Sequence, residues 1–360
     1  MARPLTPDYI QKIAPYVPGK PVKEVEREYG IVGALKLASN ENCLGTSPRA
    51  VEAIRKAAAD VWLYPESTCP YVRPKLAAKL GVSPDRLVFG DGSHELLDLA
   101  VLAFVEPGAE VLTSEMTFAI YKLATMSAGR DYREVPVRDM HYDLEALANA
   151  IRPKTRLIFL ANPNNPTGTI FRRAAFETFL ARVPEDVVIV MDEAYIEFVG
   201  DADFPDSLKY HDGKRRIFTT RTFSKIYGLA GLRIGYGIAS PEMIQALEKV
   251  RPSFNVNSLA QVAAEAALDD DDFVKRSREV AQAGVALVTR ELAKLGVKTW
   301  ESHTNFVFVD LGRPAKKFFE DMIRQSIIVR PVGPTLVRIT VGTAEQNERL
   351  LAALRTVLAT

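Results

Sequence analysis

The sequence predicts an α/β fold, in which a large domain with a mostly parallel sheet between helices precedes a smaller C-terminal α+β domain. Short β-branched runs alternate with helical periods through most of the chain, which favours a parallel sheet covered on both faces. The 360 residues suffice for two domains, and after about Pro252 a long helical period replaces the alternation. We therefore expect an N-terminal arm at 1–30, a large domain at 31–255 and a small domain at 256–360.

The expected elements follow in order along the chain. Helices and strands of the large domain are predicted at 48–60, 87–89, 94–105, 110–113, 118–127, 143–151, 156–161, 174–182, 187–191, 217–220 and 234–239. Ser47 and Pro48 suit the N-cap and first position of the first helix. The small domain is predicted to hold a helical stretch at 258–295 broken by the acidic cluster 269–272, strands at 305–310 and 336–341, and a closing helix from Ala344.

Composition excludes several classes of protein. The 46 basic and 45 acidic residues leave a net charge of +1, which gives no electrostatic case for nucleic acid or an anionic membrane as partner. Two cysteines, Cys43 and Cys69, cannot form a disulfide framework, and the N-terminus lacks the apolar core of a signal peptide. The longest apolar run, 99–105, is too short to cross a bilayer. These features together predict a cytoplasmic protein. The four histidines lack metal-ligand spacing, so we expect no histidine metal site.

A segment rich in asparagine and proline follows the strand predicted at 156–161. Residues 162–168 read Asn-Pro-Asn-Asn-Pro-Thr-Gly. The two prolines fix φ on either side of the asparagines, and Gly168 permits a tight exit. Open α/β sheets bind ligands at the carboxyl ends of their strands, so the segment predicts a rigid ligand-binding turn. A plain turn is the alternative, because Asn and Pro are common in turns.

A carboxylate ends the apolar strand predicted at 187–191. An unpaired charge at Asp192 would be costly, so this side chain requires a cation or strong donors. A protonated heterocyclic nitrogen would serve, whereas the alternative is an Asp that caps the next turn. Tyr195, three residues on, is near enough in sequence to direct its hydroxyl at the same ligand.

A lysine among hydroxyl and glycine residues follows the strand predicted at 217–220. Residues 222–233 read Thr-Phe-Ser-Lys-Ile-Tyr-Gly-Leu-Ala-Gly-Leu-Arg. Lys225, held just past a buried strand, suits a Schiff base with a carbonyl, and Arg233 offers a guanidinium to a phosphate. A solvated surface lysine is the alternative.

A glycine-containing turn precedes the helix predicted at 94–105. In Gly90-Asp91-Gly92-Ser93-His94 the two glycines let backbone N–H groups approach an anion at a helix N-terminus. Glu95 holds the place of the third glycine of a dinucleotide fingerprint, so a nicotinamide dehydrogenase is disfavoured. Taken together, the anion site, the Asn turn, the strand-end Asp, the Lys and the Arg form the set that pyridoxal phosphate requires.

The whole chain resembles the fold-type I pyridoxal-phosphate-dependent aminotransferases of the class II aminotransferase family, and among them the histidinol-phosphate aminotransferase group. The resemblance implies an aspartate aminotransferase-like fold. It runs from 13–20 to 336–343, and it is carried by the segments 162–168, 223–235, 37–42 and Tyr64-Pro65.

The resemblance also implies a role for each matching residue. Lys225 is expected to hold the cofactor as a Schiff base and to move the Cα proton, Asp192 to pair with the pyridinium nitrogen, and Phe118 to stack on the ring. Asn165 and Tyr195 are expected to hydrogen-bond the ring oxygen. The residues expected to hold the cofactor phosphate are Gly92, Ser93, Thr222, Ser224 and Arg233, with Tyr64 reaching it from the partner subunit of a homodimer.

Four further residues are expected at the substrate. Arg338 clamps the carboxylate of glutamate, while Tyr16, Asn40 and Arg330 line the pocket. Arg338 alternates with Val337 and Ile339, which places it on the opposite face of the strand from them. Phe118 and Tyr16 could instead be packing residues, and Arg330 a solvated strand end.

The expected reaction is a transamination of histidine biosynthesis, from L-histidinol phosphate and 2-oxoglutarate to imidazole-acetol phosphate and L-glutamate. The close alternatives are an aromatic amino acid aminotransferase and a pyridoxal-phosphate decarboxylase of a phosphorylated amino acid. A non-catalytic pyridoxal-phosphate effector domain of a regulator is disfavoured, because the first 30 residues cannot hold a helix-turn-helix module. Glu66 after Pro65 and the short segment between Arg330 and Arg338 depart from the group's pattern and leave the amino donor open.

Overall fold

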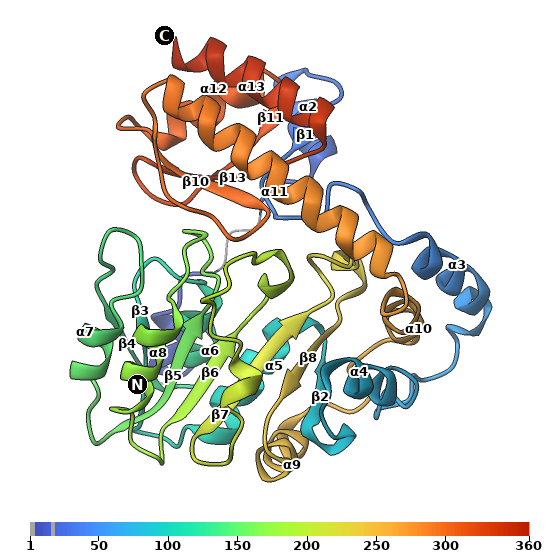
Figure 1. Ribbon diagram of the computed structural model, residues 1–360, viewed down its shortest axis with the longest axis vertical. Coiled ribbons are helices and arrows are strands. Elements are labelled where there is room, and N and C mark those ends of the chain that lie inside the picture. Colours follow the sequence, from blue (N-terminus) through green and yellow to red (C-terminus); the bar gives the residue numbers. More distant parts are fainter. Residues whose placement is uncertain (1–3, 16–18, 360) are drawn as a thin grey trace.

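A seven-stranded sheet forms the centre of the larger part of the molecule in the computed structural model, which describes residues 4–15 and 19–359 (Figure 1). The strand order is β2-β8-β7-β6-β5-β3-β4, and only β8 runs antiparallel to its neighbours. The strands are β2 (Leu87–Gly90), β3 (Glu110–Ser114), β4 (Asp131–Val135), β5 (Thr155–Ala161), β6 (Val188–Asp192), β7 (Arg216–Thr222) and β8 (Gly235–Ile238). The predicted mostly parallel sheet is confirmed.

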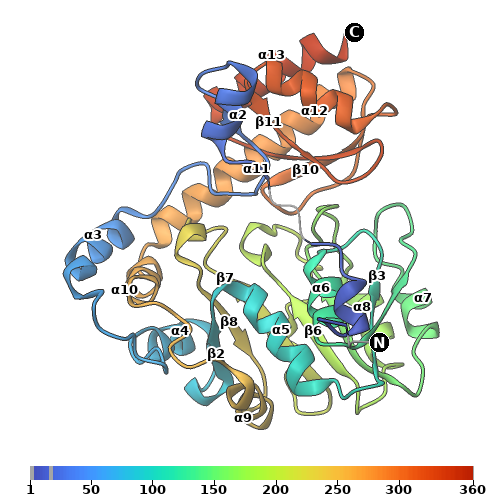
Figure 2. The same ribbon diagram turned by 180° about the vertical axis from the view of Figure 1, so that it is seen from behind.

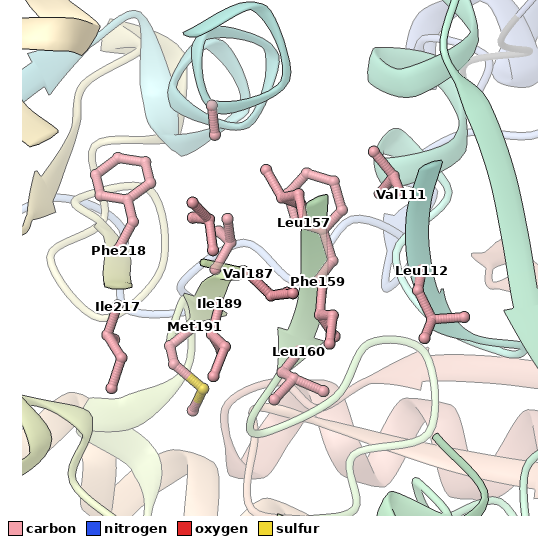
Figure 3. Packing of buried hydrophobic residues seen from close by; sticks show 14 of the residues in the cluster. Val111, Leu112, Leu157, Phe159, Leu160, Val187, Ile189, Met191, Ile217 and Phe218 are labelled. Carbon is pink, nitrogen blue, oxygen red and sulfur yellow. The ribbon is translucent and has the colours of Figure 1, made fainter. Parts of the chain in front are cut away.

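Helices cover both faces of this sheet. Figure 2 shows α5 and α6 in front of it, whereas α7 and α8 lie on the side seen in Figure 1. The bounds are α5 (Gly92–Phe104), α6 (Ile120–Ser127), α7 (Leu144–Asn149), α8 (Arg173–Leu180) and α9 (Pro241–Val250), which packs beside α5. Neighbouring residues point to opposite faces, as Phe159 and Leu160 do in Figure 3, and both are fully buried. Burial on both faces explains the continuous apolar runs in β5 and β6.

A second, four-stranded antiparallel sheet belongs to the C-terminal part of the chain. Its order is β12-β13-β10-β9, with β9 (Lys298–Thr299), β10 (Phe306–Asp310), β12 (Arg330–Pro331) and β13 (Leu336–Thr340). It packs with α11 (Asp271–Lys294), α12 (Ala315–Arg324) and α13 (Ala344–Leu358) around a core that includes Val288, Phe318 and Leu350. We call this sheet and its helices the smaller unit, and the seven-stranded sheet with its helices the larger unit.

The predicted break in the long C-terminal helix is confirmed. α10 (Ser258–Ala267) ends before the acidic cluster 269–272, and α11 begins within it, at Asp271. The carboxylate of Asp270 accepts a hydrogen bond from the backbone N–H of Phe273, so this acidic residue caps the new helix.

The N-terminal elements pack against the smaller unit. β1 (Leu35–Lys36) pairs in parallel with β11 (Ile327–Ile328), and α2 (Val22–Tyr29) buries Val25 against Ile323 and Ile328. The sequence division separated these segments, because about 290 residues lie between the paired strands. The short α1 (Asp8–Gln11) packs on α6 instead. The division at 30 and 255 itself stays a prediction.

The remaining helices frame one side of the larger unit. α3 (Pro48–Ala57) packs along α10 and continues as the 3₁₀ turn η1 (Ala58–Asp60), so the helix predicted at 48–60 tightens in its last turn. α4 (Val72–Leu80) also packs on α10. Within residues 4–15 and 19–359, no helix has the length and apolar character that a bilayer span requires.

Candidate active site

A cavity of about 200 Å³ lies where the carboxyl ends of the central parallel strands meet. The register places Ala161 at the end of β5 beside Asp192 at the end of β6, which in turn pairs with Thr220 of β7. The segments that follow these strands therefore converge on one edge of the sheet. Nine residues predicted from the sequence line this cavity: Ser93, Phe118, Asn165, Asp192, Tyr195, Thr222, Ser224, Lys225 and Arg233. His94, which the sequence reasoning had not assigned to the site, lies in the wall as well.

One end of the cavity carries a buried carboxylate. Asp192 is 5% exposed and accepts a hydrogen bond of 2.8 Å from the Tyr121 hydroxyl and one of 3.2 Å from the Ala194 N–H. Burial raises the pKa of Asp192 to about 6, against the effect of these two donors. The site is therefore short of positive charge at this carboxylate, and a bound cation beside it would stabilise the ionised form.

Tyr121 is a residue that sequence reasoning missed. It lies three positions after Phe118, is fully buried in α6 and stacks on Phe159 with ring centroids 4.5 Å apart. Its ring also meets Phe118 edge to face at 5.8 Å. The only signal in the sequence was the three-residue spacing, which brings side chains to one face of a helix.

The other end of the cavity combines donors for an anion. Ser93 lies in the first turn of α5, and the guanidinium of Arg233 lies 3.4 Å from both the Ser224 hydroxyl and the Asp91 carbonyl. A helix N-terminus, a guanidinium and hydroxyls are suited to a phosphate. The side chain of Thr222, also predicted here, accepts a hydrogen bond from the Ser224 N–H and so shapes the loop.

Two glycines permit this close approach. Gly92 has φ +73°, and a Cβ at this position would lie 2.2 Å from Nη2 of Arg233. A Cβ at Gly235 would lie 2.3 Å from the backbone nitrogen of Ser93. Any side chain at either position would push the arginine or β8 away from the start of α5.

Lys225 is held at the cavity wall by its neighbours. Phe223 and Ile226 on either side are fully buried, and the Leu229 N–H returns to the Phe223 carbonyl. The ammonium of Lys225 donates to the Ser39 carbonyl at 3.3 Å and lies 5.6 Å from the centre of the Tyr195 ring. The loop therefore presents the lysine to the cavity, whereas the alternative was a solvated surface position.

Asn40, which is predicted to line the substrate pocket, contacts Tyr195. Its side chain is 1% exposed and lies behind Tyr195, donating a hydrogen bond of 2.8 Å to the Tyr195 hydroxyl, and it is absent from the cavity wall. A role of Asn40 in binding substrate stays a prediction, and its contact with Tyr195 is the observed one.

A second cavity of about 490 Å³ adjoins the first and shares Phe118 and Asn165 with it. Arg330 and Arg338 of the smaller unit line it, together with Lys122 of α6. Arg338 donates hydrogen bonds to Oδ1 of Asn165 and to the Ala38 carbonyl. Two guanidiniums beside one cavity favour an anionic ligand.

Of the predicted site residues that the structure describes, Asn40, Gly92 and Tyr64 are absent from the walls of both cavities. Tyr64 is 83% exposed and stacks on Phe254 with ring centroids 4.8 Å apart, so it does not reach the site of its own chain. Tyr16 lies outside the residues that the structure describes. Within the described part of the chain, no cluster of three His, Cys, Asp or Glu side chains could hold a metal.

Comparison with known proteins identifies the family. The family described as Aminotransferase class I and II matches residues 32–354, and the chain belongs to this family. The curated histidinol-phosphate aminotransferase of Moorella thermoacetica is 46% identical over 355 residues, covering 97% of this chain and 92% of that protein. The histidinol-phosphate aminotransferase of an Anaeromyxobacter species is 47% identical over 99% of both chains.

Solved structures agree with the family assignment. The crystal structure of histidinol-phosphate aminotransferase from Sinorhizobium meliloti in complex with pyridoxal-5′-phosphate is similar with a TM-score of 0.91 and 32% identity, covering 99% of this chain and 98% of that one. The aspartate aminotransferase of Thermotoga maritima, 24% identical with a TM-score of 0.85 over 99% and 100% of the two chains, shares the fold.

Proposed function

We propose that the chain is a pyridoxal-phosphate-dependent aminotransferase that converts L-histidinol phosphate and 2-oxoglutarate to imidazole-acetol phosphate and L-glutamate in histidine biosynthesis. The observation that carries the proposal is the convergence of Lys225, Asp192 and Arg233 on one cavity. This convergence occurs in a chain that is 46–47% identical, over nearly its full length, to two curated histidinol-phosphate aminotransferases.

The cavity residues fit pyridoxal phosphate by charge and shape. The buried carboxylate of Asp192 suits a protonated ring nitrogen at one end, and the start of α5 with Arg233 suits a phosphate at the other. Phe118 in the wall offers an apolar face to a flat ring. The guanidinium of Arg233 occupies the space that a Cβ at Gly92 would fill, so the glycine lets the arginine approach the start of α5. This close approach supports an anion-binding site there.

Each residue has a defined task in this proposal. The bound cofactor supplies an electron-withdrawing ring that stabilises negative charge at the substrate Cα. Asp192 keeps the ring nitrogen protonated, and the hydroxyl of Tyr195 together with Asn165 holds the ring oxygen. The amine of Lys225 would hold the cofactor, and as a free amine it would take the proton from the substrate Cα and deliver it to the cofactor carbon C4′.

The adjoining cavity supplies substrate recognition. Arg338 binds the carboxylate of glutamate and 2-oxoglutarate, and Arg330 borders the same space. Histidinol phosphate carries a phosphate ester at the position where an aromatic amino acid carries its carboxylate, so two guanidiniums in this wall favour the donor with the greater negative charge.

We further propose a cytoplasmic homodimer in which Tyr64 reaches the cofactor phosphate of the partner subunit. Trp62, Leu63 and Tyr64 are exposed in succession, and Tyr64 stacks on the half-exposed Phe254. A contiguous apolar surface of this kind favours burial against another copy. Cys43 and Cys69 are both free thiols, which supports a reducing compartment.

A half-reaction screen tests the substrate. The protein loaded with pyridoxal phosphate is mixed in turn with L-histidinol phosphate, L-glutamate and L-phenylalanine, and the visible cofactor band is followed. We expect rapid loss of the band with the first two amines and slow loss with phenylalanine. A faster reaction with phenylalanine would identify an aromatic aminotransferase. Release of CO₂ from an added amino acid, without lasting loss of the cofactor band, would identify a decarboxylase.

A further inference from the structure

Asn40 is a buried residue with an unusual backbone and a complete set of partners. Its φ is +57°, a left-handed conformation that Asn tolerates better than most residues. Its N–H donates to Oγ1 of Thr340 at 3.0 Å, and its carbonyl accepts from Nδ2 of Asn305 at 3.0 Å. Its side-chain amide lies between two hydroxyls, Thr340 at 3.0 Å and Tyr195 at 2.8 Å.

The Thr340 hydroxyl decides the orientation of this amide. Its oxygen already accepts the Asn40 N–H, so its own proton needs an acceptor, and Oδ1 of Asn40 supplies one at 3.0 Å. Nδ2 of Asn40 then faces Tyr195 and can only donate. The Tyr195 oxygen accepts that bond, which leaves the Tyr195 proton to be donated elsewhere.

We infer that Asn40 is a positioning residue that fixes Tyr195 as a hydrogen-bond donor into the cavity. The inference rests on the proposed function, because the acceptor for the Tyr195 proton is the ring oxygen of pyridoxal phosphate. Tyr195 lines the cavity and Asn40 does not, so Asn40 acts through the tyrosine. An acceptor at position 40 would reverse the arrangement and draw the Tyr195 proton away from the cofactor.

The same strand holds Asn40 and supplies Arg338. Thr340 and Arg338 are two residues apart on β13, so their side chains lie on one face of the strand. Arg338 contacts Asn165 in the larger unit, while Thr340 holds Asn40 against Tyr195. Asn165 and Tyr195, the two residues proposed to hold the ring oxygen, are thus linked to β13 of the smaller unit, Asn165 directly through Arg338 and Tyr195 through Asn40.

Asn40→Gly is the direct test, because glycine accepts φ +57° without strain and removes only the amide. The variant is loaded with pyridoxal phosphate, and its visible absorption is titrated with pH. Loss of one donor to the ring oxygen disfavours the deprotonated form, so we expect the midpoint to rise by about one pH unit. We expect kcat to fall about tenfold, with KM for the amino donor changed less than twofold.

Two further variants separate positioning from stability. Asn40→Asp keeps the shape but turns the donor into an acceptor, so the midpoint should rise at least as far as in Asn40→Gly; it also decides the matter should Asn40→Gly fail to fold. Asn347→Ala is the control, because it removes another buried amide of the smaller unit. The Asn347 amide makes two hydrogen bonds to the backbone of Gly342 and has no hydrogen bond to Tyr195. This control should lower thermal stability and leave the midpoint in place.

A double variant shows whether the effect passes through Tyr195. In a Tyr195→Phe background, Asn40→Gly should shift the midpoint no further. An equal shift in both backgrounds, or an unmoved midpoint in Asn40→Gly and Asn40→Asp, overturns the inference while the proposed function stands. Failure of the unaltered protein to bind pyridoxal phosphate would instead overturn the proposed function itself.

Discussion

The two adjoining cavities are built in different ways. The walls of the first are almost entirely segments that directly follow strands β2, β5, β6 and β7, whereas the second needs Arg330 and Arg338 from the smaller unit. The residues proposed for cofactor chemistry therefore belong to the larger unit, at the ends of its sheet strands. The two arginines proposed for substrate choice belong to the smaller unit and face residues of the larger one. Changes in the first cavity should affect every substrate alike, and changes in the second should depend on the substrate.

Loss of the lysine should give the largest effect. We expect Lys225→Ala to lower kcat by about 10³-fold or more with every amino donor, because both the general base and the covalent anchor are lost. The variant should also release pyridoxal phosphate on gel filtration. Lys249→Ala, an exposed lysine of α9, is the matched control and should react normally. A retained visible band after gel filtration would show that another lysine holds the cofactor.

Arg338→Ala should separate the two cavities most sharply. Removal of a charged partner that is partly buried should lower kcat/KM for 2-oxoglutarate by roughly 100-fold. The kcat/KM of Arg338→Lys for 2-oxoglutarate should lie between the values of Arg338→Ala and of the unaltered protein, because an ammonium cannot bind a carboxylate in the bidentate manner. The affinity for pyridoxal phosphate, measured by equilibrium dialysis, should change little. An equal loss in both quantities would contradict the division of tasks between the cavities.

The buried carboxylate should make the cofactor-free protein sensitive to pH. Burial raises the pKa of Asp192 from 3.8 to about 6, so between these values the folded state binds more protons than the unfolded state. Stability contributed by this group therefore falls as pH rises from about 4 to about 6, and the full cost is present above that range. We expect Asp192→Asn to gain about 2 kcal/mol relative to the unaltered apoprotein between pH 4 and pH 7.

Urea unfolding of both apoproteins at several pH values measures this difference. Bound pyridoxal phosphate should cancel it, because a cation beside Asp192 favours the ionised form. A constant difference between the two proteins across this pH range would show that Asp192 is already ionised at pH 4.

Gly92→Ala should have the smallest effect of the four. The new Cβ would displace the Arg233 guanidinium, so we expect the affinity for pyridoxal phosphate to fall about tenfold, with a loss of about 1–2 kcal/mol in stability. Gly108→Ala shares the strained backbone, with φ +87°, but meets no neighbouring atom. It should lose stability without losing cofactor affinity, and equal affinities in the two variants would refute a role of the Gly92 space.

The sequence was informative where structure is local. The strands β5 and β6 contain continuous apolar runs, and β7 is almost fully buried although most of its residues are polar. The predicted residues Asn165, Asp192 and Lys225 lie at the ends of these three strands or within four residues after them. Position at the end of a buried strand was therefore enough to bring them together. By contrast, edge strand β4 was not predicted, because three of its five residues are charged and only Val135 is buried.

Contacts between distant segments could not be predicted from a single chain. The pairing of β1 with β11 and the contact of Asn40 with Tyr195 join residues separated by about 290 and by 155 positions. In neither pair does the local sequence around one residue predict which distant residue it contacts. Tyr121 was missed for another reason, since a buried tyrosine in an apolar helix reads equally well as a packing residue.

Helix α11 is a single rigid rod that crosses from one unit to the other (Figure 1). Its 24 residues extend over about 36 Å. Its first turn is fastened to the larger unit, because the Ser47 hydroxyl donates to the same Asp270 carboxylate that caps the helix. A tilt of about 5° around this fastening would carry the far end of the rod by roughly 3 Å. Further along the rod, Arg278 and Gln282 donate to the backbone carbonyls of Glu197 and Phe198, so any tilt of α11 that moves β13 must also change these contacts with the larger unit.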